Sequence, residues 1–316
     1  MATSTLSQVV TEVRTLLGAL VSSGPQEWSE PSPAVDGYVA LVFCVGLFVV
    51  NWGLRLVVIA PIGRVLLTSK KRKAFEPKVV RFAQSAMEAL FYGGFTVLGL
   101  TIVPKQPWMW PSALWWRDFS SGSHSWMRND LRCYYLLYGA RYFQGGMSVL
   151  LEPKRKDFVE MQIHHVVTVA VVAVSYFYGW NRVGAVVMLL LDPADVPLHV
   201  AKLLKHVGEA HQRSSPKLAS AFFLGADLTF VVFAVVFFIT RVAMYPYICW
   251  SAHVEAATHF PMGLPEWACV YLLHTLLILQ FYWFFLIVKA AAKMILQGHV
   301  EDVRSDDEDE EDDKDD

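Results

Sequence analysis

Charged residues are scarce in this sequence of 316 residues. Asp, Glu, Lys and Arg together make up 18% of the chain, whereas hydrophobic residues make up 54% and aromatic residues 14%. A soluble globular protein carries about 25% charged residues. The composition therefore excludes an ordinary soluble protein and indicates a chain that lies largely within a lipid bilayer.

Metal-binding motifs are also lacking. None of the four cysteines (Cys44, Cys133, Cys249 and Cys269) forms a CxxC pair, which argues against a structural zinc site, and a disulfide between Cys249 and Cys269 stays open. The ten histidines include one adjacent pair but no HxxxH or HxxHH box of the kind that binds two irons. We predict no metal site.

Long apolar runs are what the sequence does contain. A membrane-spanning helix needs about 20 mostly apolar residues. Seven windows meet this need: Tyr38 to Ala60, Phe82 to Val103, Leu131 to Leu151, Val159 to Tyr178, Val183 to Ala201, Leu218 to Thr240 and Trp267 to Val288. We predict an all-α, polytopic membrane bundle of about seven helices around a cavity that faces the cytosol.

Basic residues indicate the orientation, because cytosolic loops collect Lys and Arg. The loops on one side of the seven spans hold 18 bases and those on the other side hold 7. The smaller set is Arg14, Lys105, Arg117, Arg128, Arg132, Arg182 and Arg241. This bias predicts a luminal N-terminus and a cytosolic C-terminus.

Four segments follow from these assignments. Residues 1–37 form a luminal amphipathic segment, and residues 38–81 hold the first span and a basic cytosolic loop. Residues 82–290 form the helical bundle, and residues 291–316 form an acidic, disordered cytosolic tail. We interpret the basic run Lys70 to Lys73 as a contact with anionic lipid, not with nucleic acid. Ser305, followed by a run of acids, is a candidate phosphorylation site.

Several ionisable residues lie at similar depths inside the predicted spans. Counting from the cytosolic ends at about 1.5 Å per helical residue brings together His164, His165, Asp195, Glu88 and Asp227, with Arg141 in the same half. Each such group costs about 2.5–3.5 kcal/mol in a bilayer on insertion scales, so a shared depth predicts a common, water-accessible cavity. Buried ion pairs that only hold helices together remain the alternative for Arg55, Arg141, Glu88 and Asp227.

The adjacent histidines His164 and His165, called the histidine pair below, are the candidate catalytic centre. Neighbours on a helix diverge by about 100°, so one ring is expected to face the reactants while the other orients or donates. Asp192, Asp195 and His199 share one helical stripe by spacing, although Pro193 and Pro197 interrupt that helix. Imidazole beside carboxylate supports acid–base or nucleophilic chemistry. The candidate catalytic residues are therefore His164, His165, Asp192 and Asp195.

A longer motif surrounds the histidine pair. It consists of Lys154-Arg155-Lys156-Asp157-Phe158, Met161, His164-His165, Thr168, Ser175, Arg182, Gly184, Asp192, Asp195, Leu198 and Ala201-Lys202. This motif resembles the signature of the ceramide synthases, the longevity-assurance branch of the TLC-domain membrane proteins, and the resemblance covers roughly residues 70 to 245. Two positions depart from it: Leu191 stands where the family usually has histidine, and His199 where it usually has glutamate.

The resemblance implies N-acylation of a sphingoid long-chain base by a fatty acyl-CoA in the endoplasmic reticulum membrane. Acyl-CoA would be the co-substrate, and no cofactor would be permanently bound. The resemblance also implies a homodimer. Arg155, Lys156 and Lys202 would bind the CoA phosphates. Glu88, Arg141, Asp227 and His199 would also bind substrate, and His199 is a candidate to replace the missing histidine. The alternative is a non-catalytic TLC-domain lipid sensor or transporter, which would not need the histidine pair.

Overall fold

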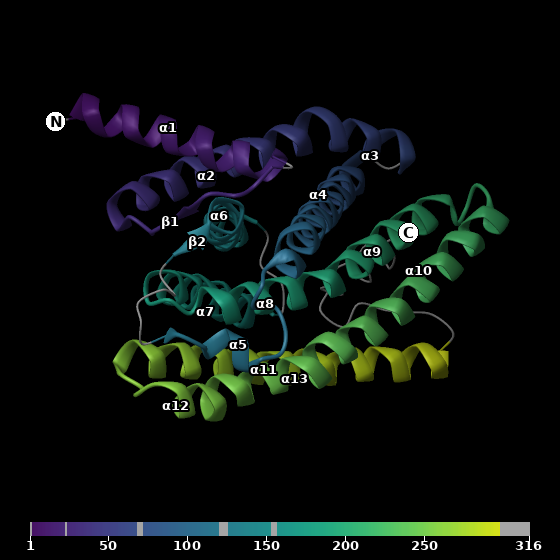
Figure 1. Cartoon of the computed structure of the whole chain (residues 1–316). Helices are drawn as coiled ribbons and strands as arrows, with labels where there is room; N and C mark the ends of the chain where they lie inside the picture. The colour runs from purple at the N-terminus through teal and green to yellow at the C-terminus, as the bar shows by residue number, and fades with distance from the viewer. Residues whose placement is uncertain (1, 23, 68–71, 120–125, 153–156, 298–316) are drawn as a thin grey trace.

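The computed structural model describes residues 2–22, 24–67, 72–119, 126–152 and 157–297, and the chain is almost entirely helical there (Figure 1). The helices are α1 (Ala2–Val21), α2 (Pro33–Leu54), α3 (Ala60–Leu66), α4 (Arg72–Ile102), α5 (Ala113–Trp116), α6 (Asn129–Leu151), α7 (Phe158–Phe177), α8 (Asn181–Leu191), α9 (Asp195–His211), α10 (Pro216–Phe237), α11 (Tyr245–Trp250), α12 (Ala256–His259) and α13 (Leu264–Gln297). Two short strands, β1 (Trp28–Ser29) and β2 (Met127–Arg128), pair antiparallel. The predicted all-α bundle is confirmed.

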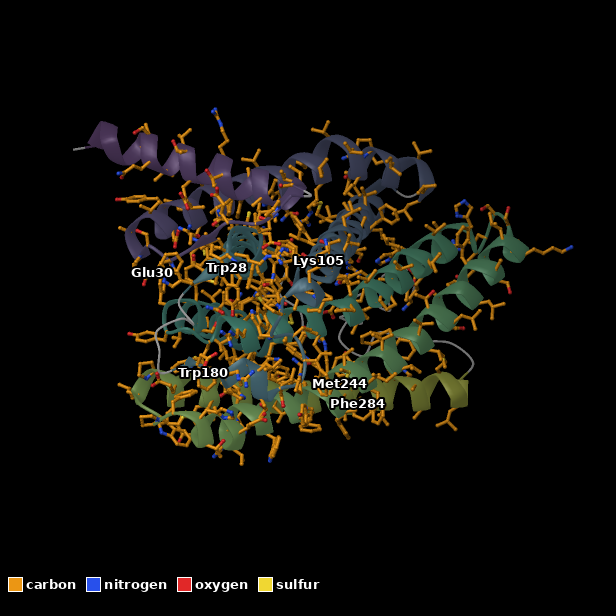
Figure 2. The ribbon with its side chains drawn as sticks, viewed as in Figure 1. Trp28, Glu30, Lys105, Trp180, Met244 and Phe284 are labelled. Atoms are coloured by element: carbon orange, nitrogen blue, oxygen red, sulfur yellow. The ribbon has the colours of Figure 1, made fainter. Side chains whose placement is uncertain are left out.

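Six stretches of helix in the described residues are long and apolar enough to cross a membrane. They are Pro33–Leu66, Glu76–Lys105, Phe158–Phe177, Asn181–His211, Pro216–His259 and Leu264–Met294. The remaining predicted span, Leu131 to Leu151, corresponds to α6, which has 23 residues but carries buried Asp130, Arg132 and Arg141. Apolar side chains point outward from many of the helices, as a lipid-facing surface requires (Figure 2).

Helix α6 lies at the centre of the bundle and is shielded by α1, α2 and α7 (Figure 1). Near its start, Arg132 forms ion pairs with Asp36 of α2 and with Glu12 of α1, at 2.5 Å for the latter. The Tyr176 hydroxyl of α7 donates to Asp36 at 2.8 Å. This network explains how a polar helix can lie inside the bundle, because each buried charge has an opposite charge beside it.

The helix that continues from α8 into α9 is interrupted at Pro193. Asp192–Ala194 form a 3₁₀ turn, and the Asp195 N–H bonds to the Asp192 carbonyl instead of the Leu191 carbonyl. Proline has no N–H and cannot continue the helical hydrogen-bond ladder. The α-helix is therefore interrupted between Asp192 and Asp195, as the prolines in the sequence indicated, and Asp195 and His199 line the main cavity described below whereas Asp192 does not.

The helix that begins at Pro216 is much longer than the predicted span. It continues through α10, a π-helical stretch Phe238–Met244, α11, a second π-helical stretch Ser251–Glu255 and α12 to His259. Arg241, which the charge count placed in a loop, therefore lies inside a helix and is 6% exposed. That assignment is wrong, because no loop begins at Thr240.

Other boundaries also differ from the sequence-based ones. Helix α2 starts at Pro33, before the expected Tyr38, and α13 continues to Gln297, beyond the expected end of the bundle at residue 290. Most of the expected basic loop between residues 61 and 81 is helical, in α3 and α4. All four cysteines are free, so the open question of a Cys249–Cys269 disulfide is answered in the negative.

Candidate active site

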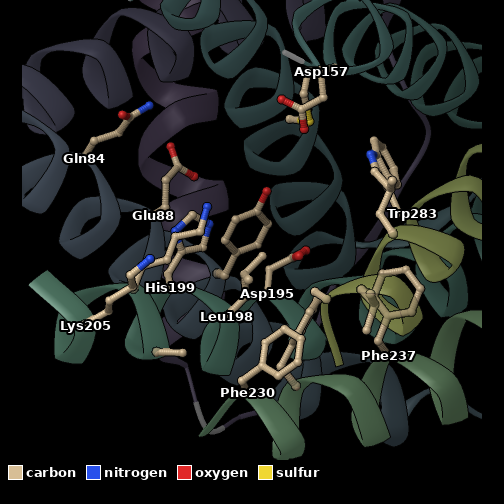
Figure 3. Close-up of a pocket in the computed structure, with 18 of the residues that line it drawn as sticks. Gln84, Glu88, Asp157, Asp195, Leu198, His199, Lys205, Phe230, Phe237 and Trp283 are labelled. Atoms are coloured by element: carbon tan, nitrogen blue, oxygen red, sulfur yellow. The ribbon is translucent and has the colours of Figure 1, made fainter. Parts of the chain in front are cut away.

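A cavity of about 570 Å³ lies among α4, α6, α7, α9, α10 and α13 (Figure 3). One part of its lining is polar and includes Glu88, Asp195, His199 and the histidine pair. The other part is aromatic and aliphatic, with Phe230, Phe233 and Phe237 of α10 opposite Trp283, Leu286 and Ile287 of α13. The cavity therefore offers reactive groups and a hydrocarbon surface within the same space.

The histidine pair lies on α7 and faces this cavity, with His164 9% and His165 7% exposed. His165 packs against α6 at Gly145 and Gly146. A Cβ added at Gly145 would lie 2.9 Å from His165 Cε1, and one at Gly146 would lie 3.2 Å from His165 Cβ. The two glycines thus let the backbone of α6 approach the imidazole closely.

Aromatic rings fix the position of both imidazoles. The Tyr142 ring lies 5.7 Å from that of His164 and 5.8 Å from that of His165, measured between centroids. The Trp283 ring meets the His164 ring edge to face at 5.2 Å. On its other edge, His164 Nδ1 lies 3.5 Å from the Thr168 hydroxyl, one turn along α7. These contacts leave His164 little rotational freedom.

Asp195, at the start of α9, forms an ion pair with Arg241 from the π-helical stretch. Arg241 also donates to the Leu191 carbonyl, at 2.5 Å from Nη2 and 3.2 Å from Nε, and to Gln280 Oε1 of α13 at 3.3 Å. The Leu191 carbonyl can accept these bonds because the 3₁₀ turn has taken away its helical partner. One guanidinium thus joins three membrane helices beside the cavity.

Two further ion pairs lie at the same cavity. Glu88 of α4 pairs with Arg141 of α6, whose guanidinium also lies 4.5 Å from the Phe91 ring, and both residues line the cavity. Arg55 pairs at 2.6 Å with Glu152, which lines the cavity and accepts a second bond from Gln84. Arg55, Arg141 and Glu88, for which the sequence left open a role in holding helices together, thus form ion pairs, and Asp227, the fourth of that group, lines the cavity.

Asp192 lies behind the histidine pair and outside the lining of the main cavity. Its Oδ1 accepts hydrogen bonds from the hydroxyls of Tyr138 at 3.0 Å and Tyr142 at 3.2 Å. Tyr134, Tyr138 and Tyr142, one turn apart on α6, form a ladder with ring centroids 5.9 and 4.8 Å apart. Asp192 therefore reaches the histidines through Tyr142 and not by direct contact.

The remaining predicted substrate-binding residues and the predicted phosphorylation site fall into two groups. His199, Lys202 and Asp227 line the cavity, and the His199 ring stacks on Tyr92 at 5.7 Å and 15°. Arg155, Lys156 and Ser305 lie outside the described residues. Among the residues that the structure describes, no group of three His, Cys, Asp or Glu side chains is arranged to hold a metal ion.

Arg241 and Tyr142 are the main site residues that the sequence-based reasoning missed. Both contact residues that were predicted, Asp195 and the histidine pair respectively. Arg241 carried a usable signal, because an arginine beside an apolar run of more than 20 residues usually pairs with an acid inside the bundle. Tyr142 carried none, since aromatic residues are common throughout the sequence.

Comparison with known proteins identifies the family. The TLC domain matches residues 81–289. The chain is 30% identical to ASC1-like protein 3 of Oryza sativa subsp. japonica over 86% of its own length and 95% of that protein. It is 28% identical to ceramide synthase LOH2 of Arabidopsis thaliana over 86% and 91%.

A third relative is ceramide synthase 4 of Mus musculus, which is 32% identical over 72% of this chain. The match covers 54% of the mouse protein, so the chain spans about half the length of that relative. The TLC-domain match over residues 81–289 contains the histidine pair and every residue that lines the cavity except Ala290. The chain therefore belongs to the TLC-domain family, in the branch of the ceramide synthases.

Proposed function

We propose that this chain is a sphingoid-base N-acyltransferase, which transfers a fatty acyl group from acyl-CoA to the amine of a long-chain base and so makes ceramide or dihydroceramide. The observation that carries the proposal is the histidine pair, buried beside carboxylates in a membrane-embedded cavity. Relatives that are named ceramide synthases match the chain across this cavity. Acyl-CoA is a co-substrate in this scheme, and no permanently bound cofactor takes part.

The histidine pair supplies two routes for the reaction. In the first, the Nε2 lone pair of one histidine attacks the thioester carbonyl, the C–S bond breaks, and the acyl-imidazole then passes its acyl group to the amine. In the second, a histidine removes a proton from the amine, which attacks the thioester directly. Asp195 and Arg241 stand beside the cavity, and Asp192 acts through Tyr142.

The two parts of the cavity suit the two parts of the substrates. The aromatic surface between α10 and α13 fits a hydrocarbon chain, which gains free energy when it leaves water. Lys202 and Lys205 also line the cavity and would contact the CoA phosphates, together with Arg155 and Lys156, which directly precede the lining residue Asp157 in sequence. We further infer that the cavity mouth faces the cytosol, in the endoplasmic reticulum membrane, with the N-terminus in the lumen; the excess of basic residues in the loops on that side supports this orientation. A homodimer is part of the same proposal, and the family resemblance supports it.

Microsomes that express the chain test the proposal when they are given acyl-CoA and sphinganine. We expect wild-type protein to form dihydroceramide and His164→Ala to form none. His253→Ala, on an exposed histidine outside the cavity, is the matched control and should keep full activity. Product from His164→Ala would contradict the catalytic assignment, and no product from wild type would favour a lipid sensor or transporter.

A further inference from the structure

Thr168 differs from three other threonines in the membrane helices of this chain. Thr229, Thr240 and Thr275 each donate a hydrogen bond to the backbone carbonyl four residues earlier, at 2.7, 2.8 and 2.9 Å. That bond is the usual arrangement for a threonine inside a helix. Thr168 instead has its hydroxyl 3.5 Å from Nδ1 of His164, the side chain four residues earlier. Its hydrogen-bonding capacity is directed at the imidazole.

The residues around Thr168 support a specific role for its contact with His164. Thr168 is 6% exposed and lines a second, small cavity of about 30 Å³ behind His164. The other hydroxyls there are engaged elsewhere, since Tyr138 and Tyr142 donate to Asp192 and Ser175 donates to the Val172 carbonyl. Leu191 adds only hydrocarbon to the same lining.

His164 lies between the two cavities, because it lines both, whereas Thr168 lines only the small one. Its Nδ1 edge faces Thr168. The two ring nitrogens of an imidazole point in diverging directions, so a ring whose Nδ1 edge meets Thr168 can direct its Nε2 edge to the main cavity. A neutral imidazole carries its proton on one nitrogen and a lone pair on the other, and the hydrogen bond to one nitrogen decides which is which.

We propose that Thr168 is a positioning residue, whose hydroxyl oxygen accepts the Nδ1–H of His164 and so holds that ring in the tautomer with its Nε2 lone pair facing the main cavity. This inference rests on the proposed acyltransferase function. In metal sites, loss of a partner that orients a ligating histidine costs about 10- to 100-fold, and we expect a loss of the same order for His164. The 3.5 Å distance suits a resting state, because such bonds tighten when substrate is bound.

The chemistry balances with Thr168 in this role. The Nε2 lone pair attacks the thioester carbonyl carbon, and CoA leaves as a thiolate, which gives an acyl-imidazolium that still carries its proton on Nδ1. The Thr168 hydroxyl oxygen continues to accept the hydrogen bond from Nδ1–H of His164. The acylated imidazole ring therefore stays cationic and remains a good leaving group. The free amine of the long-chain base then attacks, the C–Nε2 bond breaks with its electrons returning to Nε2, and the thiolate takes the amine proton.

Three variants of the full chain in microsomes test this role. Thr168→Val keeps the shape of the side chain and removes the hydroxyl, whereas Thr168→Ser keeps the hydroxyl. Thr229→Val is the matched control, because it removes a threonine hydroxyl that bonds to backbone outside the cavity lining. We expect kcat to fall about 10- to 100-fold in Thr168→Val with KM for acyl-CoA unchanged, and to stay near wild type in Thr168→Ser and Thr229→Val.

If the wild-type protein is active, the proposed function stands, and two results for the variants would then overturn the inference about Thr168. One is full kcat in Thr168→Val, and the other is an equal loss in Thr168→Val and Thr168→Ser. If Thr168→Val is not recovered as folded protein by size-exclusion chromatography, Thr168→Ala replaces it with the same expected loss. No ceramide from wild type would instead count against the proposed function itself.

Discussion

The Arg241 guanidinium, which joins three helices beside the cavity, offers the sharpest test of how the bundle is held together. In Arg241→Met the side chain keeps much of its length but loses the ion pair with Asp195 and the bonds to the Leu191 carbonyl and to Gln280. Breaking a buried ion pair by removing one partner costs about 3–5 kcal/mol, because the other charge is left uncompensated. We expect Arg241→Met to be the most destabilising single change at this site.

This expectation translates into a measurable melting shift. At about 2.1 cal/mol/K of unfolding entropy per residue, 1 kcal/mol corresponds to about 1.5 °C for a chain of 316 residues, so Arg241→Met should lower the melting temperature in detergent by about 5–8 °C. Asp195→Asn alone should cost less, about 1–3 kcal/mol, because Arg241 keeps its other partners. The double variant should be more stable than the sum of the two losses predicts, because Asp195 is then neutral.

Arg64→Met is the matched control for this cycle. Arg64 pairs with Glu76 at 3.2 Å, but the two side chains are 49% and 56% exposed, so loss of this pair should cost less than about 1 kcal/mol. The melting temperature of every variant can be measured in the same way, from the fraction of folded protein that size-exclusion chromatography recovers after heating. Strict additivity of Arg241→Met and Asp195→Asn, or an equal shift in Arg64→Met, would refute the reasoning.

Three other substitutions carry separate expectations. Gly145→Ala would place a Cβ 2.9 Å from His165 Cε1 and should reduce kcat at least about 10-fold, whereas Gly46→Ala, which meets no atom within 4 Å, should leave ceramide formation unchanged. Leu191→His should keep the fold and retain or raise activity, measured as dihydroceramide formed per folded protein, since position 191 lines the small cavity behind the histidine pair. Ser305→Ala should lower phosphate content if the acidic tail is phosphorylated; equal phosphate content and equal activity would end that idea.

Hydropathy alone located most of the helices in this chain. The predicted span Val159 to Tyr178 agrees closely with α7 (Phe158–Phe177), and Leu131 to Leu151 agrees with α6 (Asn129–Leu151). Such segments can be located because a bilayer demands about 20 apolar residues in a row. The end of the helix that begins at Pro216 could not, since its π-helical stretches keep the chain helical to His259 without any change in composition that would mark them.

The site was partly predictable for a different reason. Counting residues from the helix ends placed Glu88, Asp195 and Asp227 at the depth of the histidine pair, and all of them line one cavity. Their roles in binding and catalysis stay predictions. The partners could not be foreseen, because the pairing of Asp195 with Arg241 depends on how two distant helices lie against each other. Helical spacing alone also did not show that Asp192 lies outside the main cavity, where it accepts hydrogen bonds from Tyr138 and Tyr142.

The tyrosine ladder on α6 has a consequence for the membrane itself. A deep, wet recess shortens the barrier that the bilayer offers to ions, so a protein with such a recess must block the rest of the path. Tyr134, Tyr138 and Tyr142 are each at most 6% exposed, and apart from a small cavity of about 30 Å³ their packed rings occupy the space behind the histidines. Close-packed rings leave little room for a continuous column of water along which protons or ions could move. We therefore expect the same side chains that place Asp192 near the histidines to limit ion leakage across the membrane.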